Sequence, residues 1–259
     1  MKSLEESVVA ALDGSDIELY PFLPYILQDI WEIGTDPDVV IALIAKYFSN
    51  YNDLEILDLG CGKGAVSVKL AQRFHCSCRG IDAMSDFIQT AKEKAKEFGY
   101  ESYCTFEVGD IRKSLTHLPE FDVIILGAIG PVLGDYKETL TTLSKHLKAG
   151  GVFIIDDAYI ENSSDFTSPH MLKYDELIMQ IESAGICLVE NRVVSNQEVI
   201  ESDDLILSSI KQRCRELAEK HPEKKHIFED YIAVQEFESD VNANKAVCTT
   251  LVIKKNLDR

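Results

Sequence analysis

The chain has 259 residues, of which 46% are hydrophobic and 27% are charged. This is the composition of a globular protein, and the length suits one large domain with additions. The formal net charge of -18 repels phosphate backbones, so we expect no nucleic-acid partner, although an acidic enzyme can still carry a local basic groove. No apolar run reaches the roughly 18 residues of a membrane-spanning helix, so we also expect no membrane segment.

The cysteines and the first residues of the chain indicate a reducing compartment. Residues 1–12 contain Glu5 and Glu6 and lack the long apolar run of a secretory signal. We therefore expect a cytoplasmic protein with reduced thiols. His75, Cys76 and Cys78 form the tightest group of metal-ligand types, but no second pair follows at zinc spacing, so we expect core packing and no metal site there.

Residues 1–50 are predicted to form a helical cap. Residues 3–12 are amphipathic, and residues 19–31 form an apolar and aromatic segment that indicates a second helix. A third helix is expected over residues 36–48, because an Asp-Pro pair supplies an N-cap followed by proline at the first helical position.

From residue 54 the pattern changes to short apolar strands separated by helical segments. Helices are predicted at residues 65–74, at 85–97 with Ser85 as the N-cap, and at about 136–147, the last ending at the glycine pair 150–151. The predicted strands are residues 54–59, 77–81, 103–108, 121–126 and 152–155. Long, mostly helical crossovers between such strands require parallel pairing, and continuous apolar strands indicate a sheet covered on both faces.

The remainder of the chain adds a helix at residues 172–184, a strand at 186–194 and a last strand at 246–253. Residues 195–244 are strongly charged, helical in pattern and far too long for a hairpin loop, so we interpret them as an inserted helical pair. The predicted fold class is α/β, with a doubly wound, mostly parallel, seven-stranded sheet. One integrated domain is expected, with a cap of residues 1–50, a core of residues 51–194 and 245–259, and the insertion of residues 195–244.

A glycine cluster follows the first strand, in the segment Leu57-Asp58-Leu59-Gly60-Cys61-Gly62-Lys63-Gly64. Ligands of open α/β sheets bind outside the carboxyl ends of the strands, where this turn lies. Glycines there permit positive φ and let a ligand approach the backbone closely. A glycine-rich turn alone is weak support for a ligand site, because many strands end this way.

Two carboxylates at the ends of the next strands strengthen the prediction. Asp82 closes the second strand, where a carboxylate can accept hydrogen bonds from both hydroxyls of a ribose. Asp110 closes the third strand, where a carboxylate could accept a hydrogen bond from an adenine amine. With Asp58, three acidic residues converge at one edge of the sheet beside the glycines, which favours a ligand over three unrelated turn formers.

A nicotinamide cofactor would use the same architecture with a different motif. Its fingerprint is G-x-G-x-x-G, whereas Gly60, Gly62 and Gly64 are spaced G-x-G-x-G. Asp58 is poorly placed for a pyrophosphate and suits a ligand that carries an amino group. No Walker-type lysine followed by Ser or Thr is present, which disfavours an ATPase.

At these residues the sequence closely resembles class I S-adenosylmethionine-dependent methyltransferases, in the broad group that includes small-molecule methylating enzymes. The resemblance covers about residues 54–159, and the motif from Asp58 to Gly64 is fairly specific to the family. It implies a Rossmann-like methyltransferase fold and S-adenosylmethionine as the cofactor. The Asp58 region and the glycine backbone are implied to hold the methionine part of that cofactor.

The resemblance also places the rest of the cofactor. The ribose is implied at Asp82, the adenine between residues 83–84 and 110–111, and the transferable methyl group near Gly127, where the fourth-strand motif ends. The implied cofactor-binding residues are Asp58, Gly60, Cys61, Gly62, Gly64, Asp82, Ala83, Met84, Asp110, Ile111 and Gly127.

Catalytic residues are much less predictable than the cofactor site. The sulfonium makes the methyl group electrophilic, so the protein mainly positions the nucleophile and excludes water, and a general base is needed only for a protonated nucleophile. Tyr20, Tyr159 and His170 are weak candidates for polar groups near the methyl. The pair Asp156-Asp157 is reminiscent of the metal ligands of catechol-type methyltransferases, but Gly127 stands where those enzymes need another acid, so we expect no metal.

We expect a small-molecule acceptor, with its walls formed by the N-terminal helices and the insertion. The fourth strand lacks the Asn/Asp-Pro-Pro-aromatic motif of methylases that act on base amines. Two alternatives stay open: a regulatory protein that binds the cofactor without turnover, and a protein methyltransferase with an acidic groove for a basic peptide. The charged insertion is either a solvated helical face or the surface of a homodimer.

Overall fold

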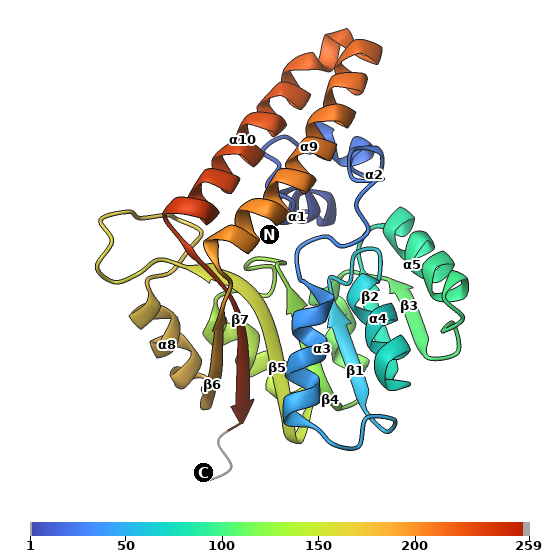
Figure 1. Ribbon diagram of the computed structural model, residues 1–259, viewed down its shortest axis with the longest axis vertical. Coiled ribbons are helices and arrows are strands. Elements are labelled where there is room, and N and C mark those ends of the chain that lie inside the picture. Colours follow the sequence, from blue (N-terminus) through green and yellow to red (C-terminus); the bar gives the residue numbers. More distant parts are fainter. Residues whose placement is uncertain (1, 256–259) are drawn as a thin grey trace.

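Seven strands form one sheet at the centre of the molecule (Figure 1). The structure is a computed structural model that describes residues 2–255, so residue 1 and residues 256–259, the ends of the predicted cap and core, lie outside the described residues. The strands are β1 Glu55–Leu59, β2 Ser77–Asp82, β3 Cys104–Val108, β4 Phe121–Gly127, β5 Leu147–Tyr159, β6 Ile186–Val193 and β7 Val247–Lys255. Their order is β3-β2-β1-β4-β5-β7-β6; β7 runs antiparallel to both neighbours and the other pairs are parallel. This confirms the predicted doubly wound, mostly parallel sheet.

Helices cover both faces of the sheet because alternate strand residues point to opposite sides. Ile56 belongs to a buried cluster beneath α3 Pro37–Tyr47, α4 Ala65–Phe74 and α5 Ser85–Glu97. Leu57, the next residue, belongs to a second cluster on the other face. The helices of that face are α6 Ile111–Ser114, α7 Tyr136–Leu143 and α8 Tyr174–Ser183. The helix α3, which the sequence assigned to the cap, therefore packs on the sheet.

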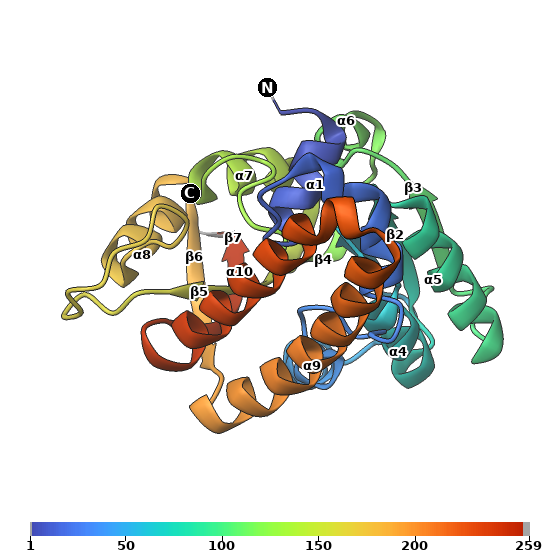
Figure 2. The ribbon, with the colours of Figure 1, turned by 90° about the horizontal axis from the view of Figure 1, so that it is seen from above.

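A third layer lies over the carboxyl ends of the strands. It consists of α1 Leu4–Ala11, the 3₁₀ helix Ile17–Phe22, α2 Leu23–Ile26, and a hairpin of α9 Asn196–Lys220 and α10 Lys225–Asn244. Figure 2 shows the hairpin lying across the strand ends beside the N-terminal helices. The two parts share one buried cluster, which includes Leu23 and Ile26 from the N-terminal segment, Ile210 and Phe228 from the hairpin, and Met84 after β2.

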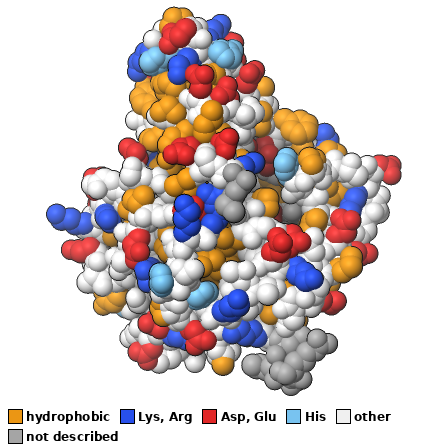
Figure 3. Space-filling model, turned by 180° about the vertical axis from the view of Figure 1, so that it is seen from behind, with side chains coloured by type: hydrophobic (Ala, Val, Ile, Leu, Met, Phe, Trp, Pro, Cys, Tyr) orange, Lys and Arg blue, Asp and Glu red, His pale blue; other side chains and the backbone are white. Residues whose placement is uncertain are grey.

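Polar contacts also join the hairpin to the N-terminal segment. Arg213 on α9 donates hydrogen bonds of 2.6 and 2.9 Å to the carboxylate of Asp29. The hydroxyl of Tyr25 donates to Glu216 at 2.5 Å. On the projecting hairpin, hydrophobic side chains lie along the flank, and acidic, basic and histidine side chains gather at the tip (Figure 3). The cap and the insertion, which are far apart in the sequence, thus form one structure.

Three local predictions were wrong, each for a reason that involves the backbone. The predicted helix over residues 19–31 is broken, because Pro21 and Pro24 lack the amide hydrogens that a continuous helix needs; a 3₁₀ helix and a four-residue α-helix replace it. Ser85 is the first helical residue of α5 and not its cap. The N-cap is Met84, whose amide hydrogen goes to Asp82 at 2.8 Å.

The third difference concerns the glycine pair at residues 150–151. The predicted helix ends at Leu143, a 3₁₀ turn follows, and β5 already begins at Leu147. Gly150 has φ of +81°, and the register between β4 and β5 shifts in this region. The glycines therefore form an irregularity within the strand, as at a β-bulge, and do not terminate a helix. Within residues 2–255, no helix combines the length and apolarity that a membrane crossing requires.

Candidate cofactor and acceptor site

The glycine turn joins β1 to α4 and is held tightly against the end of β2. Gly60, Gly62 and Gly64 have φ of +71°, +51° and +73°, in the left-handed region that other residues rarely adopt. The amide hydrogens of Gly60 and Cys61 both go to the carbonyl of Ile81, at 2.8 and 3.2 Å. The sequence thus folds this segment into a tight, half-buried turn at the edge of the sheet.

The three glycines meet different surroundings. A Cβ on Gly64 would lie 2.8 Å from atoms of Ala91 and Phe106, so this glycine allows α4 to pack closely. A Cβ on Gly60 would lie 2.4 Å from the side chain of Ile129, which comes from the loop after β4. A Cβ on Gly62 would meet nothing within 4 Å. Gly62 is therefore the position at which a ligand can approach the turn.

Asp82 connects the glycine turn to the segment that follows β2. One carboxylate oxygen accepts a hydrogen bond from the Gly62 amide at 2.9 Å, and the other accepts one from the Met84 amide at 2.8 Å. Burial raises the pKa of Asp82. Each oxygen keeps a further lone pair, so the side chain is fixed in place and can still accept hydrogen bonds from a ligand.

Asp58 is the second carboxylate of the site, and it is buried, with only 4% exposed. The Ser67 hydroxyl donates to it at 2.7 Å. Burial raises the pKa of Asp58 to about 6, and the charge of Asp82 acts in the same direction. Within residues 2–255, no lysine or arginine forms an ion pair with Asp58 or Asp82. Two neighbouring carboxylates without a counter-ion favour a positively charged ligand.

Lys63 fastens the N-terminal segment onto the glycine turn, a role that the sequence did not reveal. Its ammonium group, in a residue 5% exposed, donates hydrogen bonds to the carbonyls of Leu27 and Ile30, the latter at 2.7 Å. The indole of Trp31 returns a hydrogen bond to the Lys63 carbonyl at 3.0 Å. A pocket between the N-terminal segment and α5 also has Lys63 in its wall. The glycine turn is thus closed from above.

Other predicted cofactor residues have different surroundings. Asp110 forms a two-point ion pair with Arg112, at 2.8 and 2.9 Å, and this pair lowers the pKa of Asp110. Arg112 also donates to Ser7 on α1 at 2.9 Å. The implied role of Asp110 at the adenine edge stays a prediction. The carboxylate oxygens that would meet the adenine also accept hydrogen bonds from Arg112. The remaining members, Cys61, Ala83, Met84 and Ile111, are half-buried or buried, and the Cys61 sulfur faces Gly80.

The end of β4 lies beneath the N-terminal segment. A Cβ on Gly127 would lie 2.4 Å from Oγ1 of Thr35. Asp156 on β5 is the register partner of Gly127 and accepts a hydrogen bond from Thr250 at 2.9 Å. Burial raises the pKa of Asp156 to about 6. The place predicted for the methyl group is therefore bordered by a buried hydroxyl and a carboxylate.

The three weak catalytic candidates are not brought together. Tyr20 lies at the cofactor corner: burial raises its pKa, and the charges of nearby carboxylates, Asp82 among them, act in the same direction. Tyr159 is buried, and its hydroxyl accepts from Asn191 at 3.3 Å on the β6 side. His170 lies in an exposed loop, and its charge acts on the carboxyl of Glu238 on α10. Only Tyr20 among them is near enough to Asp82 for the charge of that carboxylate to act on it.

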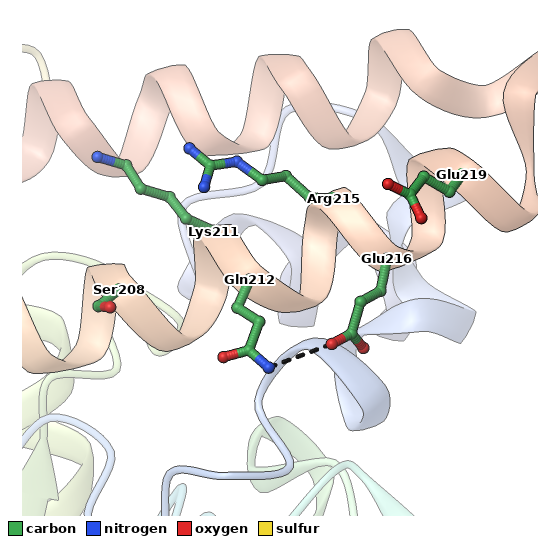
Figure 4. Close-up of a pocket in the computed structure, with 6 residues that line it drawn as sticks. All are labelled: Ser208, Lys211, Gln212, Arg215, Glu216 and Glu219. Carbon is green, nitrogen blue, oxygen red and sulfur yellow. Dashed lines mark hydrogen bonds between the residues drawn. The ribbon is translucent and has the colours of Figure 1, made fainter.

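Within residues 2–255, no three His, Cys, Asp or Glu side chains converge as metal ligands. The buried Cys76 and Cys78 lie with their sulfurs 3.8 Å apart in the core. Asp157 accepts from Tyr136 at 2.6 Å, whereas Asp156 faces Thr250. A shallow pocket on α9 lies elsewhere and is lined by one helix alone, by Ser208, Lys211, Gln212, Arg215, Glu216 and Glu219 (Figure 4).

Comparisons with known proteins agree with this geometry. The family described as "Methyltransferase domain" matches residues 50–223. The ubiquinone biosynthesis O-methyltransferase of Rickettsia canadensis is 33% identical over 118 residues, which are 44% of this chain and 48% of that protein. A probable cobalt-precorrin-6B C(15)-methyltransferase of Methanothermobacter thermautotrophicus is 30% identical over 110 residues, 42% of this chain and 55% of that protein. The chain thus spans about half the length of these curated relatives.

The fold is shared over nearly the whole chain. A SAM-dependent methyltransferase from Geobacter sulfurreducens, solved in complex with S-adenosyl-L-homocysteine, superimposes with a TM-score of 0.75 at 18% sequence identity. The superposition covers 91% of this chain and 98% of that one. With a family match over most of its length and the expected sheet, this chain belongs to the methyltransferase domain family.

Proposed function

We propose that this chain transfers a methyl group from S-adenosylmethionine to a small-molecule acceptor. The observation that carries the proposal is the hydrogen bond between the Gly62 amide and the Asp82 carboxylate, at the ends of β1 and β2. Space beside Gly62 is open to a ligand. The Asp82 carboxylate is held in place by hydrogen bonds from two backbone amides. Family membership and relatives that methylate small molecules support the same reaction class.

The charge of the site fits this cofactor. S-adenosylmethionine carries a sulfonium and an ammonium group, and its methyl group is electrophilic when it binds. Asp58 and Asp82 supply negative charge without a lysine or arginine ion pair among the described residues. We assign Asp82 to the ribose and the Asp58 region with the Gly62 backbone to the methionine part.

The protein's contribution to the reaction is position and the exclusion of water. Lys63 and Trp31 hold the N-terminal segment over the glycine turn, and Thr35 covers the end of β4. A cofactor on β1 and β2 would direct its methyl toward Gly127. The acceptor would then approach from above β4 and β5, beneath the hairpin.

Calorimetric titration tests the cofactor assignment. S-adenosylmethionine and S-adenosylhomocysteine should bind, NADH should not, and Asp82→Ala should abolish binding. Glu101→Ala is the control, because Glu101 is exposed in the turn before β3, does not line the pocket that contains Lys63, and should leave binding unchanged. Equal loss of cofactor binding in both variants, or binding of NADH in place of the two sulfur nucleosides, would refute the site. Tight binding without turnover on any metabolite would favour a regulatory protein.

A further inference from the structure

The side chain of Arg112 joins the segment after β3 to α1. Its Nε and Nη2 donate hydrogen bonds to the two carboxylate oxygens of Asp110, at 2.8 and 2.9 Å. Its Nη1 donates to the hydroxyl of Ser7 at 2.9 Å and to the carbonyl of Lys2 at 3.1 Å. The guanidinium group is thus held from two sides, and it holds the Asp110 carboxylate in one orientation.

The Asp110 carboxylate keeps one position at which it can accept another hydrogen bond. Its Oδ1 accepts from the Arg112 amide at 3.0 Å and from Arg112 Nε. Among the described residues, its Oδ2 accepts from Arg112 Nη2 alone, because the Lys113 ammonium group lies 3.7 Å away. A carboxylate oxygen has two lone pairs, so one stays free at Oδ2. The ion pair with Arg112 also lowers the pKa of Asp110, which keeps this oxygen negatively charged at neutral pH.

The chemistry of the cofactor places its base beside Asp110. In S-adenosylmethionine the ribose carries the base on one side and the methionine part on the other. With the ribose at Asp82 on β2 and the methyl directed toward Gly127 on β4, the base must point toward β3, the neighbour of β2 on the opposite side. The segment after β3 is close to Asp82, because the Gly109 amide donates to the Asp82 carbonyl at 2.8 Å.

The end of β3 has a surface suited to a purine. Val108 is the register partner of Asp82, so the two side chains point to the same side of the sheet. Val108 is 55% exposed, although it is a large apolar residue. A purine base has an apolar face that can cover such a side chain, and adenine has an amino group at its edge that can donate to a carboxylate oxygen. Val108 and the Asp110 carboxylate thus offer both kinds of contact two residues apart, beside the place of the ribose.

We propose that Arg112 is a positioning residue for purine recognition. By fixing the Asp110 carboxylate, it keeps Oδ2 ready to accept a hydrogen bond from the amino group of adenine. This inference rests on the proposed function, because the base is placed relative to a ribose at Asp82. It makes the site selective: the Asp110 side chain is only 8% exposed, so a purine without the amino group leaves a charged, nearly buried oxygen without that partner.

The test is calorimetry on the full chain with S-adenosylhomocysteine and with its analogue that has hydrogen in place of the adenine amino group. We expect the wild type to bind S-adenosylhomocysteine about tenfold or more tightly than the analogue, and Arg112→Met to bring the two affinities within about threefold of each other. Arg112→Lys should behave like Arg112→Met, because a lysine cannot form the two-point contact. Arg79→Met is the matched control: Arg79 on β2 pairs with Glu107 on β3 at 2.9 Å, so its loss should leave the preference unchanged.

The ratio of the two affinities separates positioning from a structural role, because a general loosening of the site weakens both ligands alike. If Arg112→Met keeps the full preference, or Arg112→Lys restores it, Arg112 does not position Asp110 through a two-point contact and the inference is wrong. Equal binding of both nucleosides by the wild type would show that the amino group is not recognised at Asp110. Failure of both nucleosides to bind any of the proteins would overturn the proposed function itself. Melting temperatures verify that all variants are folded.

Discussion

Replacing Asp58 by asparagine should stabilise the protein while impairing cofactor binding. Asp58 is 4% exposed, and burial raises its pKa from 3.8 to about 6. At about 1.36 kcal/mol for each pKa unit, the charged form costs about 3 kcal/mol at neutral pH. Asparagine has nearly the same shape and can still accept the hydrogen bond from Ser67, so Asp58→Asn should remove most of that cost.

The gain in stability should depend on pH with a defined sign. Below pH 3.8 the carboxyl is protonated in both the folded and the unfolded state, so Asp58→Asn and wild type should differ little. Between pH 3.8 and about 6 the folded state binds more protons, and the wild type loses stability as pH rises. Above pH 6 the full difference of about 3 kcal/mol should be present. Urea unfolding at several pH values between 3.5 and 8 measures it.

Asp165→Asn is the control, because Asp165 is exposed in a loop and should show no such pH dependence. Calorimetry on the same Asp58→Asn protein should show weaker binding of S-adenosylmethionine. The reasoning would be refuted if Asp58→Asn were less stable than wild type at pH 8, or if the difference did not change with pH. Such a result would mean that the contacts of the charged Asp58 carboxylate stabilise the folded state by more than its burial costs.

Gly62→Ala should reduce cofactor binding at least tenfold and stability by about 1 kcal/mol, whereas Gly99→Ala, with a similar positive φ and open surroundings, should cost only stability. Calorimetry and urea unfolding distinguish the two. Lys63→Met should release the N-terminal segment, seen as faster hydrogen exchange at residues 27–31; unchanged exchange would contradict its role. Leu57→Ala should lower the free energy of unfolding by about 2–5 kcal/mol, and a loss below 1 kcal/mol in urea would show that this core site repacks.

Much of the fold could be predicted because local and tertiary preferences agree. The helix at residues 65–74 and the strands around it have strong periodicity and glycine boundaries, and the structure reproduces them within a residue or two. The failures occur where the backbone decides the outcome. Pro21 and Pro24 interrupt an apolar segment that would otherwise continue as a helix. Gly150 adopts positive φ inside a strand, which composition alone cannot distinguish from a helix end.

The candidate site could be predicted only where one short motif carries it. The glycine turn and Asp82 are close in sequence, so their role could be inferred together. The contacts of Lys63 with residues 27 and 30 join segments far apart in the chain, and the burial of Asp58 also depends on the tertiary fold. One signal was present: the chain carries a large excess of acidic residues, but the sequence does not show which of them are buried. The homodimer through the insertion stays a prediction.

Transfer of a labelled methyl group tests the central claim most directly. The full chain would be incubated with S-adenosylmethionine carrying a tritiated methyl group and a pool of small metabolites, with Asp82→Ala as the matched protein. We expect S-adenosylhomocysteine formation and tritium in a small molecule, both lost in Asp82→Ala. Tritium that stays on the cofactor, or that enters protein alone, would contradict a small-molecule methyltransferase.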